Sequence, residues 1–143
     1  MKRQVFVVLA SLTLFLVSVH AQQSGTIIVA HIPFDFVVRD KTLPAGDYTV
    51  TRAAQGVLMI RSRDCKASMV FNTNTVESTR TRNELIFHRY GSRYFLSRVW
   101  TASSNTGGEL KKCRTERDLT WAKISKAAGE PELETVSVLA LQR

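Results

Sequence analysis

The sequence lacks the short motifs that mark the common enzyme classes. It contains no GxSxG or HExxH motif, no glycine-rich phosphate loop and no dinucleotide-binding fingerprint. It has no CxxC pair, no internal repeat of solenoid length and no calcium loop around Asp64, Asn72 and Asn74. Each absence removes a reason to assign nucleophilic hydrolysis, zinc proteolysis, nucleotide binding, thiol redox chemistry or a solenoid fold.

The chain nevertheless has enough apolar residues for one folded domain. It has 143 residues, of which 44% are apolar, and this content argues against disorder. The length is too short for two ordinary domains, and a chain of this size buries roughly two-thirds of its unfolded surface. We therefore expect a single domain over residues 22–143, preceded by a leader.

Residues 1–21 have the layout of a secretory signal peptide. Lys2 and Arg3 are followed by an apolar run from Val5 to Val19 and a small residue, Ala21, at the expected cleavage site. The alternative is an uncleaved anchor, but the run is shorter than the ~20 residues that span a bilayer. No second apolar stretch is long enough to span one. We expect a soluble mature protein, secreted or periplasmic.

Alternating apolar residues predict a mainly β domain. Every even-numbered residue from Ile28 to Val38 is apolar, and Pro33 predicts an edge or a bend. The segments Glu84–Tyr90 and Arg93–Thr101 flank Gly91-Ser92, which predicts a hairpin. Further strands are expected at Tyr48–Thr51, Val57–Ser62, Ala67–Thr75 and Thr135–Leu141. This pattern favours an antiparallel β-sandwich or barrel of about six to eight strands; a single antiparallel sheet backed by a helix is the rival.

One helix is expected in the C-terminal half, over about residues 109–128. It follows the glycine-containing stretch Ala102–Gly108, and Glu109 would lie in its first turn. Gly129 and Pro131 would end it. The Gly107-Gly108 pair is read as a hinge or as an anion site at the helix start. Apolar residues recur at helical spacing at Leu110, Cys113, Trp121, Ile124 and Ala128.

The chain is basic, with 20 Lys and Arg against 12 Asp and Glu and a formal net charge of +8. Such a surface attracts nucleic acid, acidic polysaccharide or anionic lipid. No run of five basic residues occurs, and an exported protein rarely meets nucleic acid. The basic residues therefore serve solubility and scattered ion pairs, or they bind envelope polysaccharide or anionic lipid. On the expected helix, Lys112 and Glu116 have the spacing of a helical ion pair.

The two cysteines, Cys65 and Cys113, leave two alternatives open. An even number of cysteines in an exported protein favours a disulfide, which would stabilise the fold by about 4 kcal/mol in the chain-entropy model. The alternative is two separate thiols. Neither cysteine has a neighbouring histidine, and the chain offers no ligand set at zinc spacing. We expect no metal site and no cofactor.

Two groups of residues are candidates for chemistry. His88 with Glu84 could serve a hydrolase as a general base, or His88 could be a packing histidine. Tyr90, Tyr94 and Trp100 could form an aromatic platform for a sugar or peptide, or they could fill the core.

Three segments together resemble a known group of proteins. They are Ile32–Val50, Phe87–Trp100 and Gly108–Leu110 with Glu116-Arg117. The chain resembles small exported bacterial proteins, frequent in acidobacteria, that have no assigned activity. The resemblance implies a bacterial envelope setting and supplies no catalytic or ligand residues.

These observations leave three functional hypotheses. The first is an exported, non-enzymatic β-rich module that binds a ligand or gives structural support at the cell envelope. The second is a small secreted hydrolase that uses His88 and Glu84. The third is a polyanion-binding protein that acts through its surface arginines.

Overall fold

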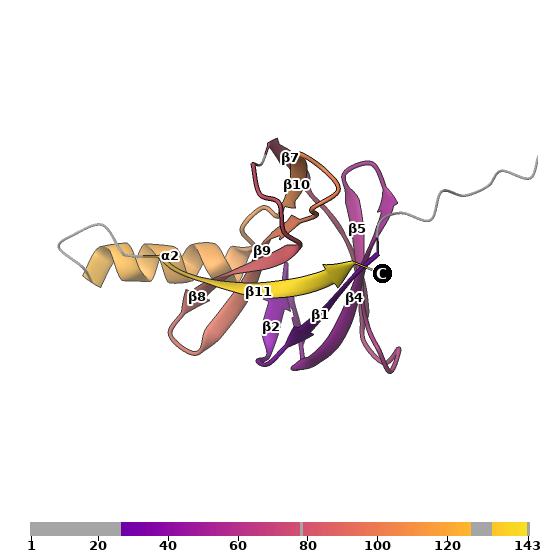
Figure 1. Cartoon of the computed structure of the whole chain (residues 1–143). Coiled ribbons are helices and arrows are strands. Elements are labelled where there is room, and N and C mark those ends of the chain that lie inside the picture. The colour runs from indigo at the N-terminus through magenta and orange to yellow at the C-terminus, as the bar shows by residue number, and fades with distance from the viewer. Residues whose placement is uncertain (1–26, 78, 127–132, 143) are drawn as a thin grey trace, which may run out of the picture.

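A computed structural model describes residues 27–77, 79–126 and 133–142 (Figure 1). The predicted leader and the predicted helix terminators Gly129 and Pro131 lie outside these residues. The described part contains eleven strands and one helix. They are β1 (Ile27–Ile32), β2 (Phe36–Val38), β3 (Lys41–Leu43), β4 (Gly46–Ala54), β5 (Val57–Ser62), β6 (Ser68–Asn72), β7 (Asn74–Glu77), β8 (Glu84–Tyr90), β9 (Arg93–Trp100), β10 (Thr106–Glu109), α2 (Arg114–Lys126) and β11 (Glu134–Gln142).

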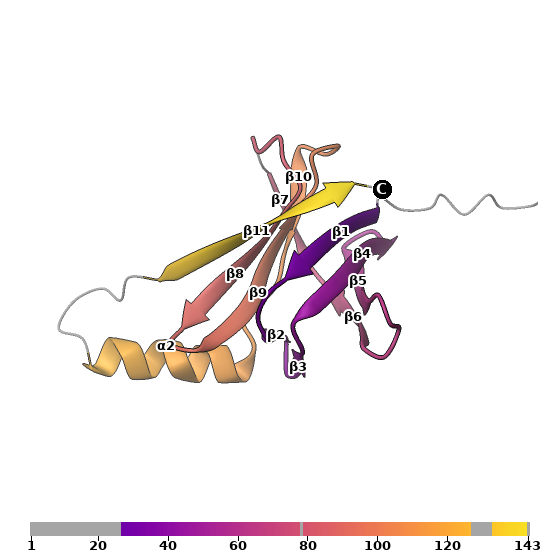
Figure 2. The same ribbon diagram turned by 60° about the horizontal axis from the view of Figure 1, so that its bottom comes forward.

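The expected mainly β domain with one helix is confirmed, and its strands form one curled sheet, an open half-barrel (Figure 2). The strand order is β3-β2-β9-β8-β11-β1-β4-β5-β6, and β10 pairs with both β7 and β9. Only β2 and β9 pair in parallel among these neighbours in the described chain. There are more strands than the expected six to eight, because a break at Pro33 divides one predicted strand region into β1 and β2, and the short strands β3, β7 and β10 were not expected.

The two ends of the described chain meet in the middle of the sheet. Strand β11 lies between β1 and β8 and pairs antiparallel with both. On the other side, β6 pairs with β5 while β7 pairs with β10, and only Thr73 separates β6 from β7. The β6–β7 segment therefore links two distant parts of the curled sheet.

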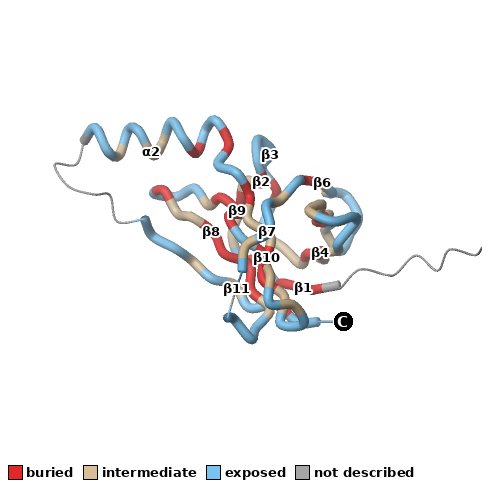
Figure 3. Tube along the Cα trace, turned by 90° about the horizontal axis from the view of Figure 1, so that it is seen from above, coloured by how far each residue is buried: buried red, intermediate tan, exposed pale blue. Residues whose placement is uncertain are grey.

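The inner face of the sheet forms the core. Ile28, Ala30 and Ile32 of β1 are all buried, so the alternation read from the sequence is confirmed (Figure 3). Phe36 lies at the centre, with its ring centroid 5.1 Å from Tyr48 and 5.5 Å from Phe87 in edge-to-face geometry. Burial of these rings is a large part of the hydrophobic stabilisation.

The predicted hairpin of β8 and β9 is confirmed, whereas the predicted start of the helix is wrong. Glu109 is the last residue of β10 and pairs with Arg98, with 2.7 Å between Arg98 Nη2 and its carboxylate. The helix begins at Arg114. Gly107 and Gly108 lie in β10 opposite Trp100 and Val99, so they are neither a hinge nor a helix start. In the described part of the chain, no helix is long and apolar enough to cross a membrane.

The cysteines are two separate thiols, so the alternative of a disulfide is not supported. Cys65 is exposed in the turn after β5, with φ at 59°, and Cys113 is buried immediately before α2. The fold itself keeps them apart, because the two residues lie on elements that do not pack together.

Thiol labelling should distinguish the two cysteines. Burial raises the pKa of the Cys113 thiol, whereas Cys65 is open to solvent. We expect an aromatic disulfide reagent to modify Cys65 quickly and Cys113 only on unfolding, and we expect reducing agent to leave the melting temperature unchanged. A melting temperature that falls on reduction would show that a disulfide forms after all.

Candidate functional site

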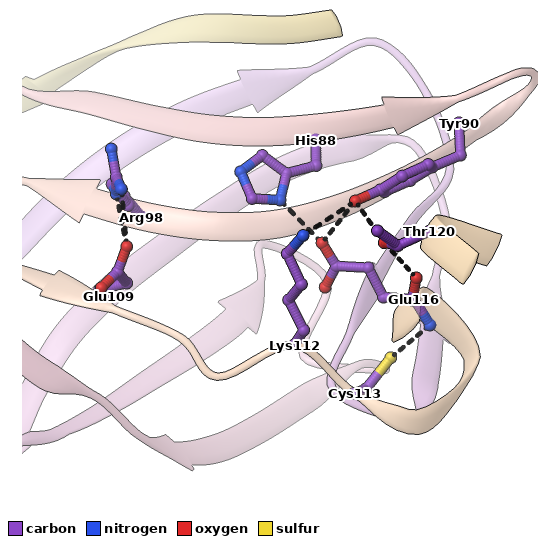
Figure 4. Close-up of polar contacts among 8 residues, drawn as sticks. All are labelled: His88, Tyr90, Arg98, Glu109, Lys112, Cys113, Glu116 and Thr120. Carbon is purple, nitrogen blue, oxygen red and sulfur yellow. Dashed lines mark hydrogen bonds and ion pairs between the residues drawn. The ribbon is translucent and has the colours of Figure 1, made fainter. Parts of the chain in front are cut away.

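His88 of β8 contacts a carboxylate, but not the predicted one. Its Nδ1 lies 2.7 Å from Oε1 of Glu116 on α2 (Figure 4). Glu84 instead pairs with Arg80, with 2.6 Å between Arg80 Nη1 and its carboxylate. The structure does not bring His88 and Glu84 together, because four residues along a strand separate two side chains by about 13 Å.

Glu116 is the centre of a buried polar cluster between β8 and α2. Its side chain is 5% exposed, and the Tyr90 hydroxyl donates to it at 3.4 Å. Thr120 Oγ1 lies 3.1 Å from the Tyr90 oxygen and 2.9 Å from the Glu116 carbonyl oxygen, and Lys112 Nζ lies 3.5 Å from the Tyr90 oxygen. We call these residues, with His88, the junction cluster.

The junction cluster holds the first turns of α2 against the sheet. Cys113, Glu116 and Thr120 follow one another at helical spacing, so they share the side of the helix that faces the sheet. The amide of Glu116 donates to Cys113 Sγ at 3.4 Å, and Glu116 lies in the first helical turn, where a negative charge complements the helix dipole. From the sequence, Glu116 was expected to form a helical ion pair with Lys112. The i, i+3, i+7 spacing of Cys113, Glu116 and Thr120 could have indicated instead that Glu116 lies on the buried side of the helix.

The second histidine of the described chain, His31, contacts an acid on the neighbouring strand. His31 and Asp47 are partners in the β1–β4 register, with 2.7 Å between His31 Nδ1 and Asp47 Oδ1. The hydrogen bond from His31 is the largest cause that lowers the pKa of Asp47. Both side chains are well exposed, so this contact is a surface cross-strand pair.

The three aromatic candidates do not share one platform. Tyr94 packs with the main core and stacks on Phe34, with ring centroids 3.8 Å apart. Tyr90 packs with Phe95 in a separate cluster beside Cys113. Trp100 is 6% exposed and covers β10. Regular alternation would place Tyr94 and Trp100 on one face, but an extra residue in β9, where the β8–β9 register shifts between Leu96 and Arg98, reverses the alternation between them.

Comparison with protein-family models, with curated proteins and with solved structures finds no match to this chain.

A cavity of about 150 Å³ lies at the end of the half-barrel opposite the junction cluster; we call it the mouth cavity. Leu58 and Val99 give it an apolar floor. Polar side chains surround this floor, and sequence reasoning did not single them out, because they come from four separate segments of the chain. They are Arg52, Gln55, Thr73, Thr75, Thr101 and Thr106.

Backbone contacts fix the shape of the mouth cavity. The turn between β4 and β5 contains Gly56 at φ 70°, and the Thr73 amide donates to its carbonyl oxygen at 2.7 Å. Gly108 leaves room on the far wall, because a Cβ there would lie 2.9 Å from Thr73 Oγ1 and 3.2 Å from Leu58 Cδ1. The cavity thus depends on a glycine on each side of Thr73.

The mouth cavity offers hydrogen-bonding groups that the described part of the chain does not use. No hydrogen bond or ion pair engages the side chains of Arg52, Gln55 or Thr101 within residues 27–77, 79–126 and 133–142. A more open hollow of about 630 Å³, lined by Glu77, Thr79, Asn105 and Thr106, shares Thr106 with it. Together they form a polar groove that an extended ligand could follow.

Neither His31 nor His88 is among the residues that line the mouth cavity or the open hollow. No group of three or more His, Cys, Asp or Glu side chains that could hold a metal ion occurs among the described residues. The chemistry that the groove offers is hydrogen bonding by hydroxyl and amide groups, together with the guanidinium of Arg52 in the mouth cavity and the carboxylate of Glu77 in the open hollow.

Proposed function

We propose that this chain is an exported, non-enzymatic binding module of the bacterial cell envelope, and that envelope polysaccharide is its ligand. The observation that carries the proposal is the mouth cavity, where the side chains of Arg52, Gln55 and Thr101 make no hydrogen bond or ion pair within the described residues. Ligand sites combine an apolar surface with a few convergent polar groups, and the mouth cavity has both.

The size and shape of the groove favour a chain of sugars. The mouth cavity is smaller than the roughly 300–1,000 Å³ of sites that enclose a whole drug-sized ligand. It therefore suits one unit of a longer molecule, and the open hollow beyond Thr106 would take the next units. Hydroxyl and amide side chains match sugar hydroxyl groups as donors and acceptors.

Arg52 favours a polysaccharide that carries carboxylates. Its guanidinium is exposed at the rim of the mouth cavity and can donate two parallel hydrogen bonds to a carboxylate. Four other arginines are already paired with acids on the surface, namely Arg63, Arg80, Arg89 and Arg98. The number of basic residues is therefore larger than the number of cations that are free to bind an anionic ligand.

Co-sedimentation with insoluble bacterial peptidoglycan, whose stem peptides supply carboxylates, tests the proposal. We expect the chain to be retained at moderate salt, and Arg52→Ala to weaken retention by about 10- to 100-fold, since a hydrogen bond to a charged group contributes about 1.5–3 kcal/mol. Thr101→Val should weaken it by about 2- to 10-fold, because it removes one neutral hydrogen bond.

Thr49→Val is the matched control, because Thr49 lies on the outer face of β4 and is not among the residues that line the groove. This variant should bind like the parent chain. Equal binding by the Arg52, Thr101 and Thr49 variants, or no retention of the parent, would contradict the proposal.

A further inference from the structure

One side of the helix α2 is largely exposed in the described chain. Arg114, Arg117, Trp121 and Ile124 follow at spacings of three, four and three residues, so they share one side of the helix, which we call the outer face of α2. Trp121 is 68% exposed and Ile124 is 45% exposed. Tryptophan side chains are mostly buried in folded domains, and exposed apolar groups often mark a surface that binds a partner.

The outer face of α2 is exposed and lies beside the side of the helix that packs on the sheet. Glu116 and Thr120 hold that packed side against β8, about 100° around the helix axis from Arg117 and Trp121, and Lys123 lies over the Tyr90 ring with Nζ 5.3 Å from its centroid. Figure 2 shows the C-terminal half of α2 extending beyond the β8–β9 hairpin, and Figure 3 shows most of the helix as exposed. The helix can therefore lie on a flat surface without disturbing the sheet.

The charge around the outer face is mostly positive. Between residues 111 and 121, Lys111, Arg114 and Arg117 are exposed against the single exposed acid Asp118, whereas Lys112 reaches the Tyr90 hydroxyl in the junction cluster. The other acid of this segment, Glu116, is buried in the junction cluster. The outer face thus combines cations with a tryptophan and an isoleucine.

We propose that the outer face of α2 docks on an anionic phospholipid surface. Basic side chains attract anionic headgroups, and tryptophan prefers the boundary between headgroups and acyl chains. A nucleic acid would account for the arginines but not for Ile124 beside them, and the apolar pair favours the lipid. This inference concerns a surface separate from the mouth cavity and does not depend on polysaccharide binding.

The two tryptophans of the chain make the test direct. Trp100 is buried, whereas Trp121 is exposed, so a change in emission on adding vesicles reports mainly Trp121. With vesicles of phosphatidylglycerol and phosphatidylethanolamine, we expect the emission of the full chain to shift to shorter wavelength and iodide quenching to fall. Phosphatidylcholine vesicles should produce neither change, and Trp121→Phe should abolish both.

Charge variants test the electrostatic part. The double change Arg114→Gln with Arg117→Gln should weaken binding to the anionic vesicles by roughly 30-fold, and added salt should weaken binding of the parent. The matched control is Arg61→Gln with Arg82→Gln, two exposed arginines outside α2, which should bind like the parent. Residues 1–26 are identical in all variants, so the apolar leader affects each equally.

Three outcomes would overturn the proposal. The Trp121 emission could stay unchanged at every concentration of anionic lipid, as expected if this face binds RNA or an acidic protein instead. Binding could be equal to anionic and to phosphatidylcholine vesicles. The two double variants could also lose affinity equally. Arg52→Ala serves as a cross-check, since it should impair retention on peptidoglycan while leaving vesicle binding intact.

Discussion

Glu116→Ala is expected to destabilise the protein by about 3 kcal/mol and to release α2 from the sheet. The change leaves His88 Nδ1 without its carboxylate at 2.7 Å and removes the acceptor of the Tyr90 hydroxyl, while both side chains stay largely buried. Urea unfolding measures the loss of free energy, and amide hydrogen exchange in residues 114–126 measures the release of the helix.

Asp118→Ala is the matched control, because Asp118 is an exposed acid on the same helix and should change stability by less than about 0.5 kcal/mol. Glu116→Gln keeps an acceptor and should cost less than the alanine variant. If the Glu116→Ala and Asp118→Ala chains unfold at the same urea concentration, the junction cluster does not hold the helix.

The same variant separates the binding and hydrolase hypotheses. The mouth cavity includes Val99 and Thr101, at the end of β9 that is remote from Tyr90 and Glu116. Folded Glu116→Ala protein should therefore keep its retention on peptidoglycan. Hydrolysis of a polysaccharide by the parent chain that disappears in the His88→Ala and Glu116→Ala variants would instead favour catalysis by this pair.

Gly107→Ala is expected to destabilise the protein by about 3 kcal/mol, at the upper end of the usual cost of overpacking. A Cβ at residue 107 would lie 2.0 and 2.3 Å from two carbons of the Trp100 ring, so the buried indole must move. Thermal unfolding measures the effect, and the emission of Trp100 reports the local change.

A rescue variant makes this prediction specific. Trp100→Leu in the Gly107→Ala chain should recover part of the stability, because the smaller side chain leaves room for the added methyl group. Ser103→Ala, in the exposed turn before β10, controls for the substitution and should be nearly neutral. Additive effects of the changes at residues 100 and 107 would show that the two residues are not in contact.

The sequence predicted those features that depend on neighbouring residues. The alternation of Ile28, Ala30 and Ile32 indicated a half-buried strand, and Gly91 at φ 63° forms the hairpin turn that its position suggested. These local predictions agree with the folded structure because strand geometry and turn conformation depend on only a few neighbouring residues.

The sequence did not predict side-chain contacts between residues that are far apart in the chain. His88 was a candidate from the sequence, yet its acid lies 28 residues away on α2. The Gly107-Gly108 pair reads locally as a flexible hinge, but Trp100 and Thr73 make both glycines packing requirements. The helix start was wrong for a related reason, since pairing with β9 holds Glu109 in a strand.

The sequence alone determined that the domain is built mainly of β-strands with one helix, because each strand and turn depends on short-range periodicity and backbone preference. Only the tertiary structure decided that β11 enters between β1 and β8, that Arg52 and Thr101 meet at the mouth cavity, and that Trp121 stays exposed. The physical reason is that strand order and helix docking follow from burying the inner face of the whole sheet at once, and no single segment contains that information.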